Sequence, residues 1–106
     1  MSEQVRELLG RLRRGLEQVY GARLCGLYLY GSVARGEADD ESDLDVLIVL
    51  DRVDAYAAEV GRTSALTSAL SLDFGRSVSR VFVSQADWAD RDSPFLANVR
   101  EEAIAA

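Results

Sequence analysis

The first apolar pattern along the chain has a helical period. Six aliphatic residues recur at spacings of three and four, with arginine and glutamate between them: Val5, Leu8, Leu9, Leu12, Leu16 and Val19. This spacing predicts an amphipathic helix over residues 3–20, because such positions lie on one face of an α-helix. Ser2 stands where a serine N-cap is expected.

Three short apolar runs, at residues 24–30, 43–50 and 78–83, predict β-strands. The second run ends in five consecutive aliphatic residues, 46–50, which is typical of a strand buried on both faces. Residues 54–72 are rich in Ala, Leu and Ser and predict a crossover helix between the second and third strands. Its predicted core face carries four side chains: Tyr56, Val60, Leu66 and Leu70.

Two further helices are predicted after the third strand. Ser84 caps a helix that runs through Asp90, and Ser93 with Pro94 opens a last helix, since proline is tolerated at the first helical position. The expected order is therefore helix, strand, turn, strand, helix, strand, helix, helix. This order predicts an α/β (α+β) fold, with a small mixed sheet and flanking helices, as a single domain over residues 1–106.

The composition removes several kinds of chemistry. The chain contains no histidine, and all 12 of its basic residues are arginine. A histidine base, a Schiff-base lysine and a P-loop lysine are therefore excluded. The single cysteine, Cys25, excludes an internal disulfide and a multi-cysteine metal site, and we expect it to be a small buried apolar residue. Catalysis would depend on carboxylates, hydroxyls, arginines, backbone dipoles and a metal.

The charge balance and hydropathy indicate the class of partner. The net charge of −6 argues against long duplex nucleic acid as a ligand. No apolar run approaches the roughly 20 residues that span a bilayer, and the first residues do not form a signal peptide. We therefore expect a cytoplasmic protein without a membrane partner.

A turn that favours anions is predicted at Gly31 and Ser32, directly after the first strand. Glycine lets the backbone approach a ligand closely, and N–H groups at a helix start beside a serine hydroxyl attract phosphate. The simpler interpretation is a plain turn between two strands, where both residue types are common.

Asp43 and Asp45 stand two residues apart at the start of the second strand, so they point to the same face. Two adjacent carboxylates repel each other, and Mg²⁺ relieves that repulsion while binding substrate phosphates as well. The alternative is a solvated strand edge whose charges oppose aggregation.

Together these residues form a recognisable pattern, Gly-Ser, ten residues, then Asp-x-Asp. It resembles the signature of the polymerase-β-like nucleotidyltransferase superfamily. The string GSVARGEADDESDLDVLIVL is similar to the minimal nucleotidyltransferase (MNT) branch, and the close match covers residues 27–50.

The resemblance implies a role for each matching residue. Gly31 and Ser32 would hold the β- and γ-phosphates of ATP or another nucleoside triphosphate, with Ser42 in the same phosphate-binding set. Arg35 would contact phosphate or brace the loop. Asp43 and Asp45 would be the catalytic residues and would bind one or two Mg²⁺ ions.

The resemblance also implies an activity and a partner. A nucleoside monophosphate, AMP from ATP, would be transferred to a hydroxyl acceptor with loss of pyrophosphate. Members of the minimal branch often act as the antitoxin beside a HEPN-type partner protein, and some transfer AMP to a partner tyrosine. The acceptor site would then be shared with that partner or with a second subunit.

The chain departs from the family at one place. Active members usually carry a third carboxylate on the strand after the crossover helix, but residues 75–83 contain none, and Ser79 stands at the expected position. Two hypotheses therefore stay open: a Mg²⁺-dependent nucleotidyltransferase, or a catalytically weak or inactive antitoxin that acts by protein–protein contact.

Overall fold

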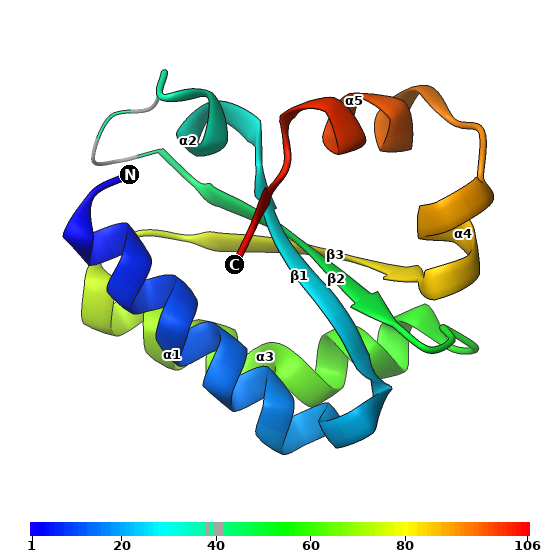
Figure 1. Ribbon diagram of the computed structural model, residues 1–106. Helices are drawn as coiled ribbons and strands as arrows, with labels where there is room; N and C mark the ends of the chain where they lie inside the picture. The colour runs from blue at the N-terminus through cyan, green and yellow to red at the C-terminus, as the bar shows by residue number, and fades with distance from the viewer. Residues whose placement is uncertain (38, 40–41) are drawn as a thin grey trace.

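The computed structural model describes residues 1–37, 39 and 42–106 (Figure 1). Helices α1 and α3 lie together against one face of a four-stranded sheet, and α4 and α5 lie on the opposite side. The described elements, in chain order, are α1 (Glu3–Tyr20), the 3₁₀ turn η1 (Gly21–Arg23), β1 (Leu24–Tyr30), α2 (Gly31–Arg35), β2 (Leu44–Leu50), α3 (Tyr56–Phe74), β3 (Val78–Ser84), α4 (Gln85–Asp90), α5 (Pro94–Glu102) and β4 (Ile104–Ala105).

The predicted element order and the mixed sheet are confirmed. The sheet order is β3-β2-β1-β4; β2 and β3 are parallel and joined by α3, whereas β1 is antiparallel to both β2 and β4. The hydroxyls of Ser2, Ser84 and Ser93 accept main-chain N–H bonds at the starts of α1, α4 and α5, as expected of N-caps. The two-residue β4 was not predicted, because so short a segment has no periodicity.

Strand β2 is buried on both faces, which explains its unbroken aliphatic run. Leu44, Val46, Ile48 and Leu50 face α1 and α3, while Leu47 and Val49 face the apolar cluster under α4 and α5. Because side chains alternate along a strand, Asp45 lies on the same face as Leu47, toward α5. None of the helices in the described part of the chain has both the length and the apolar character needed to cross a bilayer.

The predicted core face of α3 is partly wrong. Of the four predicted side chains Leu70 is buried, Val60 and Leu66 are partly buried, and Tyr56 is 46% exposed. The polar residues Glu59, Thr63 and Thr67 are buried instead. They are tolerated there because each has partners: Glu59 accepts hydrogen bonds from the Tyr20 hydroxyl, Arg23 and Arg62, and Thr63 accepts one from Arg80.

Two predictions near the first strand are also corrected. Val19 is 42% exposed, and Tyr20 takes the last buried position of α1. Cys25 is exposed rather than buried. The pairing of β1 with β2 shifts register between Leu24 and Gly26, so Cys25 lies at an irregularity at the start of β1, outside the regular alternation of buried and exposed positions.

Candidate functional site

The Gly31 turn lies directly against the Asp45 carboxylate. Gly31 begins α2 with a φ of 78°, a backbone conformation that L side chains rarely adopt. A Cβ atom at this position would collide with the Asp45 carboxylate oxygen. Glycine is therefore required here for two reasons, and its absent side chain leaves the space that Asp45 occupies.

The two predicted aspartates lie close enough together for the charge of Asp43 to act on Asp45. Asp43 immediately precedes β2 and is exposed, whereas Asp45 is the second residue of the strand and is partly buried. Between and after them, Leu44 and Val46 are fully buried on the other face. Burial raises the pKa of Asp45 above its ordinary value, and the charge of Asp43 raises it further. A cation bound between the two carboxylates would offset both the cost of burying the Asp45 charge and its repulsion from Asp43.

The neighbours of Asp45 across the sheet are Tyr30 on β1 and Ser79 on β3. Ser79 thus stands beside Asp45 in the register position where the third strand could have supplied a carboxylate. Burial and the nearby Asp45 charge raise the pKa of Tyr30 to about 12, so its hydroxyl is protonated at neutral pH. Among the described residues, no group of three or more acidic, cysteine or histidine side chains is placed to hold a metal.

The other predicted phosphate-binding residues, Ser32, Ser42 and Arg35, differ in how many hydrogen bonds and ion pairs they already form within the chain. The Ser32 hydroxyl has no hydrogen-bond partner among the described residues. The Ser42 hydroxyl accepts the Asp39 N–H at 3.2 Å and donates to the Asp39 carboxylate at 3.1 Å, so it holds its own loop. Arg35 forms ion pairs with Glu37 and Glu102, both at 3.0 Å.

Glu102 was not predicted from the sequence, yet it contacts the turn directly. Its Oε1 accepts the Gly31 N–H at 2.9 Å, and its Oε2 accepts a bond from Arg35 Nη1 at 3.0 Å. These donors hold the pKa of Glu102 below its ordinary value. Glu102 ends α5, 71 residues from Gly31, so no local pattern could have indicated the contact.

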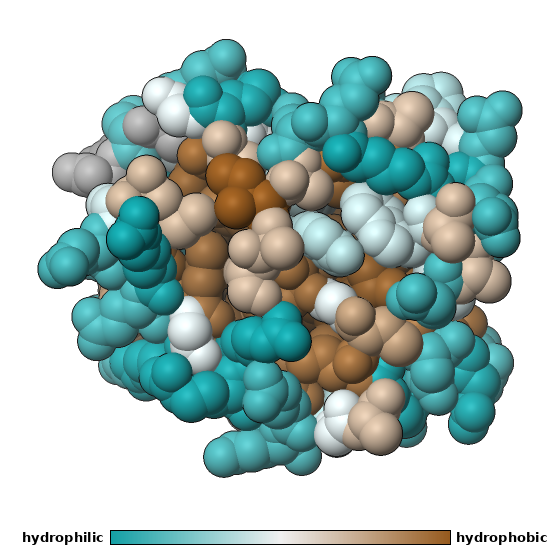
Figure 2. Space-filling view, in the orientation of Figure 1, coloured by the Kyte–Doolittle hydropathy of each residue, from teal (hydrophilic) through white to brown (hydrophobic). Residues whose placement is uncertain are grey.

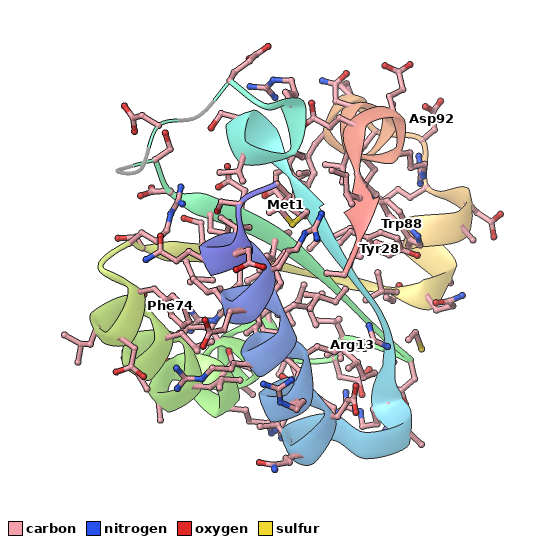
Figure 3. All side chains as sticks on the ribbon, turned by 60° about the vertical axis from the view of Figure 1, so that its left-hand side comes forward. Met1, Arg13, Tyr28, Phe74, Trp88 and Asp92 are labelled. Atoms are coloured by element: carbon pink, nitrogen blue, oxygen red, sulfur yellow. The ribbon has the colours of Figure 1, made fainter. Side chains whose placement is uncertain are left out.

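Aromatic contacts hold α4 and α5 against β1, and α5 carries Glu102. Tyr28 packs against Trp88 of α4 with ring centroids 4.9 Å apart. Both side chains are labelled in Figure 3, where they lie side by side. Tyr30 packs edge-to-face against Phe95 of α5 at 5.7 Å. Both tyrosines project from β1 toward α4 and α5, so the strand that leads into the Gly31 turn also positions α5.

Arg76 is a second residue that was not predicted. It lies in the turn before β3 and is 7% exposed. Its guanidinium donates to the Ser42 carbonyl oxygen from Nη2 at 2.7 Å and from Nε at 3.1 Å, and to the Asp39 carbonyl oxygen at 3.2 Å. Arg76 therefore holds Ser42, the residue directly before Asp43.

Replacing Arg76 with alanine is expected to lower the free energy of unfolding by about 1–3 kcal/mol, because the Ser42 carbonyl loses its charged partner. Urea unfolding followed by circular dichroism measures the change. Arg14→Ala is the matched control, since Arg14 is exposed on α1 and has no hydrogen-bond or ion-pair partner among the described residues. Equal stability of the two variants would show that Arg76 does not brace this segment.

A family model and two solved structures of known proteins match this chain, and all three are described as nucleotidyltransferases. A family model described as a nucleotidyltransferase domain matches residues 9–93. A crystal structure from Sulfolobus solfataricus, of a protein provisionally assigned as a nucleotidyltransferase, is 19% identical with a TM-score of 0.56; the alignment covers 99% of this chain and 86% of that chain. A structure provisionally assigned as a minimal nucleotidyltransferase is 28% identical with a TM-score of 0.51, over 93% and 92% of the respective chains. No curated protein matches.

Proposed function

The chain belongs to the nucleotidyltransferase domain family, and from this premise we propose that it transfers AMP from ATP to a hydroxyl acceptor with Mg²⁺ as the cofactor. The observation that carries the proposal is the contact between the Asp45 carboxylate and the Gly31 backbone. It puts a carboxylate pair suited to a cation beside a turn that offers hydrogen-bond donors to an anion. A metal–triphosphate complex requires this combination.

The donor set fits Mg²⁺. Asp43 and Asp45 offer hard carboxylate oxygens, and Mg²⁺ is commonly held by one or two carboxylates together with substrate phosphates. Burial and the Asp43 charge raise the pKa of Asp45, and a bound cation would favour its ionised form. When bound, the ion would supply the charge that offsets the negative charge of the phosphates during transfer.

The chain's own residues would bind and orient the substrate. The Ser32 hydroxyl and the Gly31 N–H would donate hydrogen bonds to the β- and γ-phosphates, and the Arg35 guanidinium would contribute a positive charge beside them. In the transfer, a bond forms between the acceptor oxygen and the α-phosphorus, and the bond from that phosphorus to the bridging oxygen breaks. Pyrophosphate leaves with that oxygen, and the acceptor proton passes to a base from outside the chain.

We extend the proposal to the acceptor, a hydroxyl on a HEPN-type partner protein. The likeness of the Gly31–Leu50 sequence to the minimal branch supports this choice. Ser79 supports it as well, because a site with no carboxylate at this position of β3 leaves a role for a base from outside the chain.

The direct test is transfer from ATP labelled at the α-phosphorus. The purified protein, mixed with Mg²⁺ and the product of a neighbouring gene, is expected to release pyrophosphate and to label that protein. Chelation of Mg²⁺ with EDTA should stop both signals. Label transfer that persists unchanged in EDTA would contradict the metal assignment, and no transfer to any hydroxyl acceptor would contradict the activity.

A second candidate function is a binding module without transfer. Two observations favour it: Ser79 in place of a carboxylate, and Glu102 bonded to the Gly31 N–H. Calorimetry separates the two functions. ATP with Mg²⁺ binding more weakly than about 1 mM to the isolated protein, together with a tight complex to the partner, would favour contact alone.

A further inference from the structure

A carboxylate of the chain itself occupies the anion-binding donors of the proposed site. Glu102 accepts the Gly31 N–H with one oxygen and pairs with Arg35 through the other. Its side chain is 23% exposed. In Figure 1 the end of α5 lies beside α2, the helix that begins at Gly31. These are charge-assisted hydrogen bonds of the kind that a phosphate oxygen would make.

The residues after Glu102 are attached to the sheet by few bonds. Strand β4 pairs with β1 over two residues, Ile104 and Ala105. The Ala106 N–H donates to the Leu27 carbonyl at 2.9 Å, and Arg13 donates to the main-chain oxygen of Ala106 at 2.7 Å. Figure 2 shows apolar surface on the face of the molecule where the C-terminus lies, and Ile104 is 39% exposed. So short a pairing opens more readily than the sheet interior.

We propose that Glu102 is an internal anion that closes the phosphate site, and that a nucleoside triphosphate binds by displacing it from Gly31 and Arg35. The inference rests on the proposed function. The Gly31 N–H is a single donor, already bonded to Glu102, so a phosphate oxygen can take it only if Glu102 leaves, and the two anions would repel each other at this distance. Displacement also moves the Glu102 charge away from Asp45, and so reduces the repulsion that the phosphates would meet there.

The test compares binding of two probes, inorganic tripolyphosphate and ATP with Mg²⁺, by isothermal titration calorimetry. The Glu102→Gln variant is expected to bind both about tenfold more tightly than the unmodified chain, because the competing charge is gone. Glu101→Gln is the matched control: Glu101 is the adjacent exposed residue, so the substitution changes the net charge equally without touching Gly31. Its affinity should equal that of the unmodified chain.

Three other results would overturn the inference in distinguishable ways. If both Glu102→Gln and the unmodified chain bind equally, the proposed function stands and the closing role fails. If Glu102→Gln binds more weakly or loses transfer activity, Glu102 assists the substrate rather than excluding it. If neither binds either probe, the proposed function fails together with the inference. A gain in affinity cannot arise from misfolding, so the expected result does not depend on a stability correction.

Discussion

Substituting Asp43 and Asp45 together with asparagine is expected to lower the rate of AMP transfer by about 10³-fold or more. Asparagine keeps the shape of each side chain but removes the charge that would hold Mg²⁺. Ser79, the β3 neighbour of Asp45, has no carboxylate to take their place, and no group of three or more acidic, cysteine or histidine side chains among the described residues is placed to hold a metal. The measurement is pyrophosphate release from ATP with Mg²⁺ and acceptor present.

The same double variant is expected to unfold at a higher temperature than the unmodified chain. The pKa of Asp45 is raised in the folded state by burial and by Asp43, so ionised Asp45 opposes folding at neutral pH. Asparagine removes that opposition. The increase in unfolding temperature should be largest at pH values above the folded-state pKa of Asp45. It should shrink as the pH falls toward the ordinary pKa of aspartate, below which Asp45 is protonated in the folded and the unfolded chain alike.

Asp90 and Asp92 provide a control with the same two-residue spacing. Both are exposed, and their replacement with asparagine removes the same charge away from Gly31. This variant should keep its transfer rate. Full activity in the Asp43/Asp45 variant, or an equal loss in both double variants, would reject the assignment of the carboxylate pair.

The parts of the site that could be predicted are those fixed by local sequence. Alternation along β2 puts Asp45 on the face opposite Leu44 and Val46 once those two are recognised as core, and Asp43 directly precedes the strand. The turn at Gly31 follows from a strand that ends just before a glycine and a serine. The order of elements follows from the periods of the apolar residues and from serine caps that act within three residues.

The parts that could not be predicted depend on contacts between distant segments. Glu102 reaches Gly31 only because α5 packs across the sheet, and Arg76 reaches Ser42 only because β3 lies beside β2. The buried face of α3 was mispredicted for a related reason. Glu59 is charged, and nothing near it in sequence indicates that Tyr20 and Arg23 come from α1 and η1 to bind it.

Substituting Gly31 with alanine is expected to remove activity and to destabilise the fold. The positive φ at this position costs an alanine about 1–2 kcal/mol. Its methyl group would also collide with the Asp45 carboxylate, so either the turn or the carboxylate must move. We expect the free energy of unfolding to fall by about 1–3 kcal/mol and the transfer rate to fall about as far as in the aspartate variant.

Gly75 separates the two causes in this prediction. It ends α3 with a φ of 67°, and a Cβ atom there would meet nothing within 4 Å. Gly75→Ala therefore carries a comparable backbone cost without crowding Asp45. Urea unfolding should show both alanine variants destabilised, while pyrophosphate release should fall only in Gly31→Ala. Normal activity in Gly31→Ala would mean that close approach of the turn to Asp45 is not needed for transfer, and would contradict the proposed function.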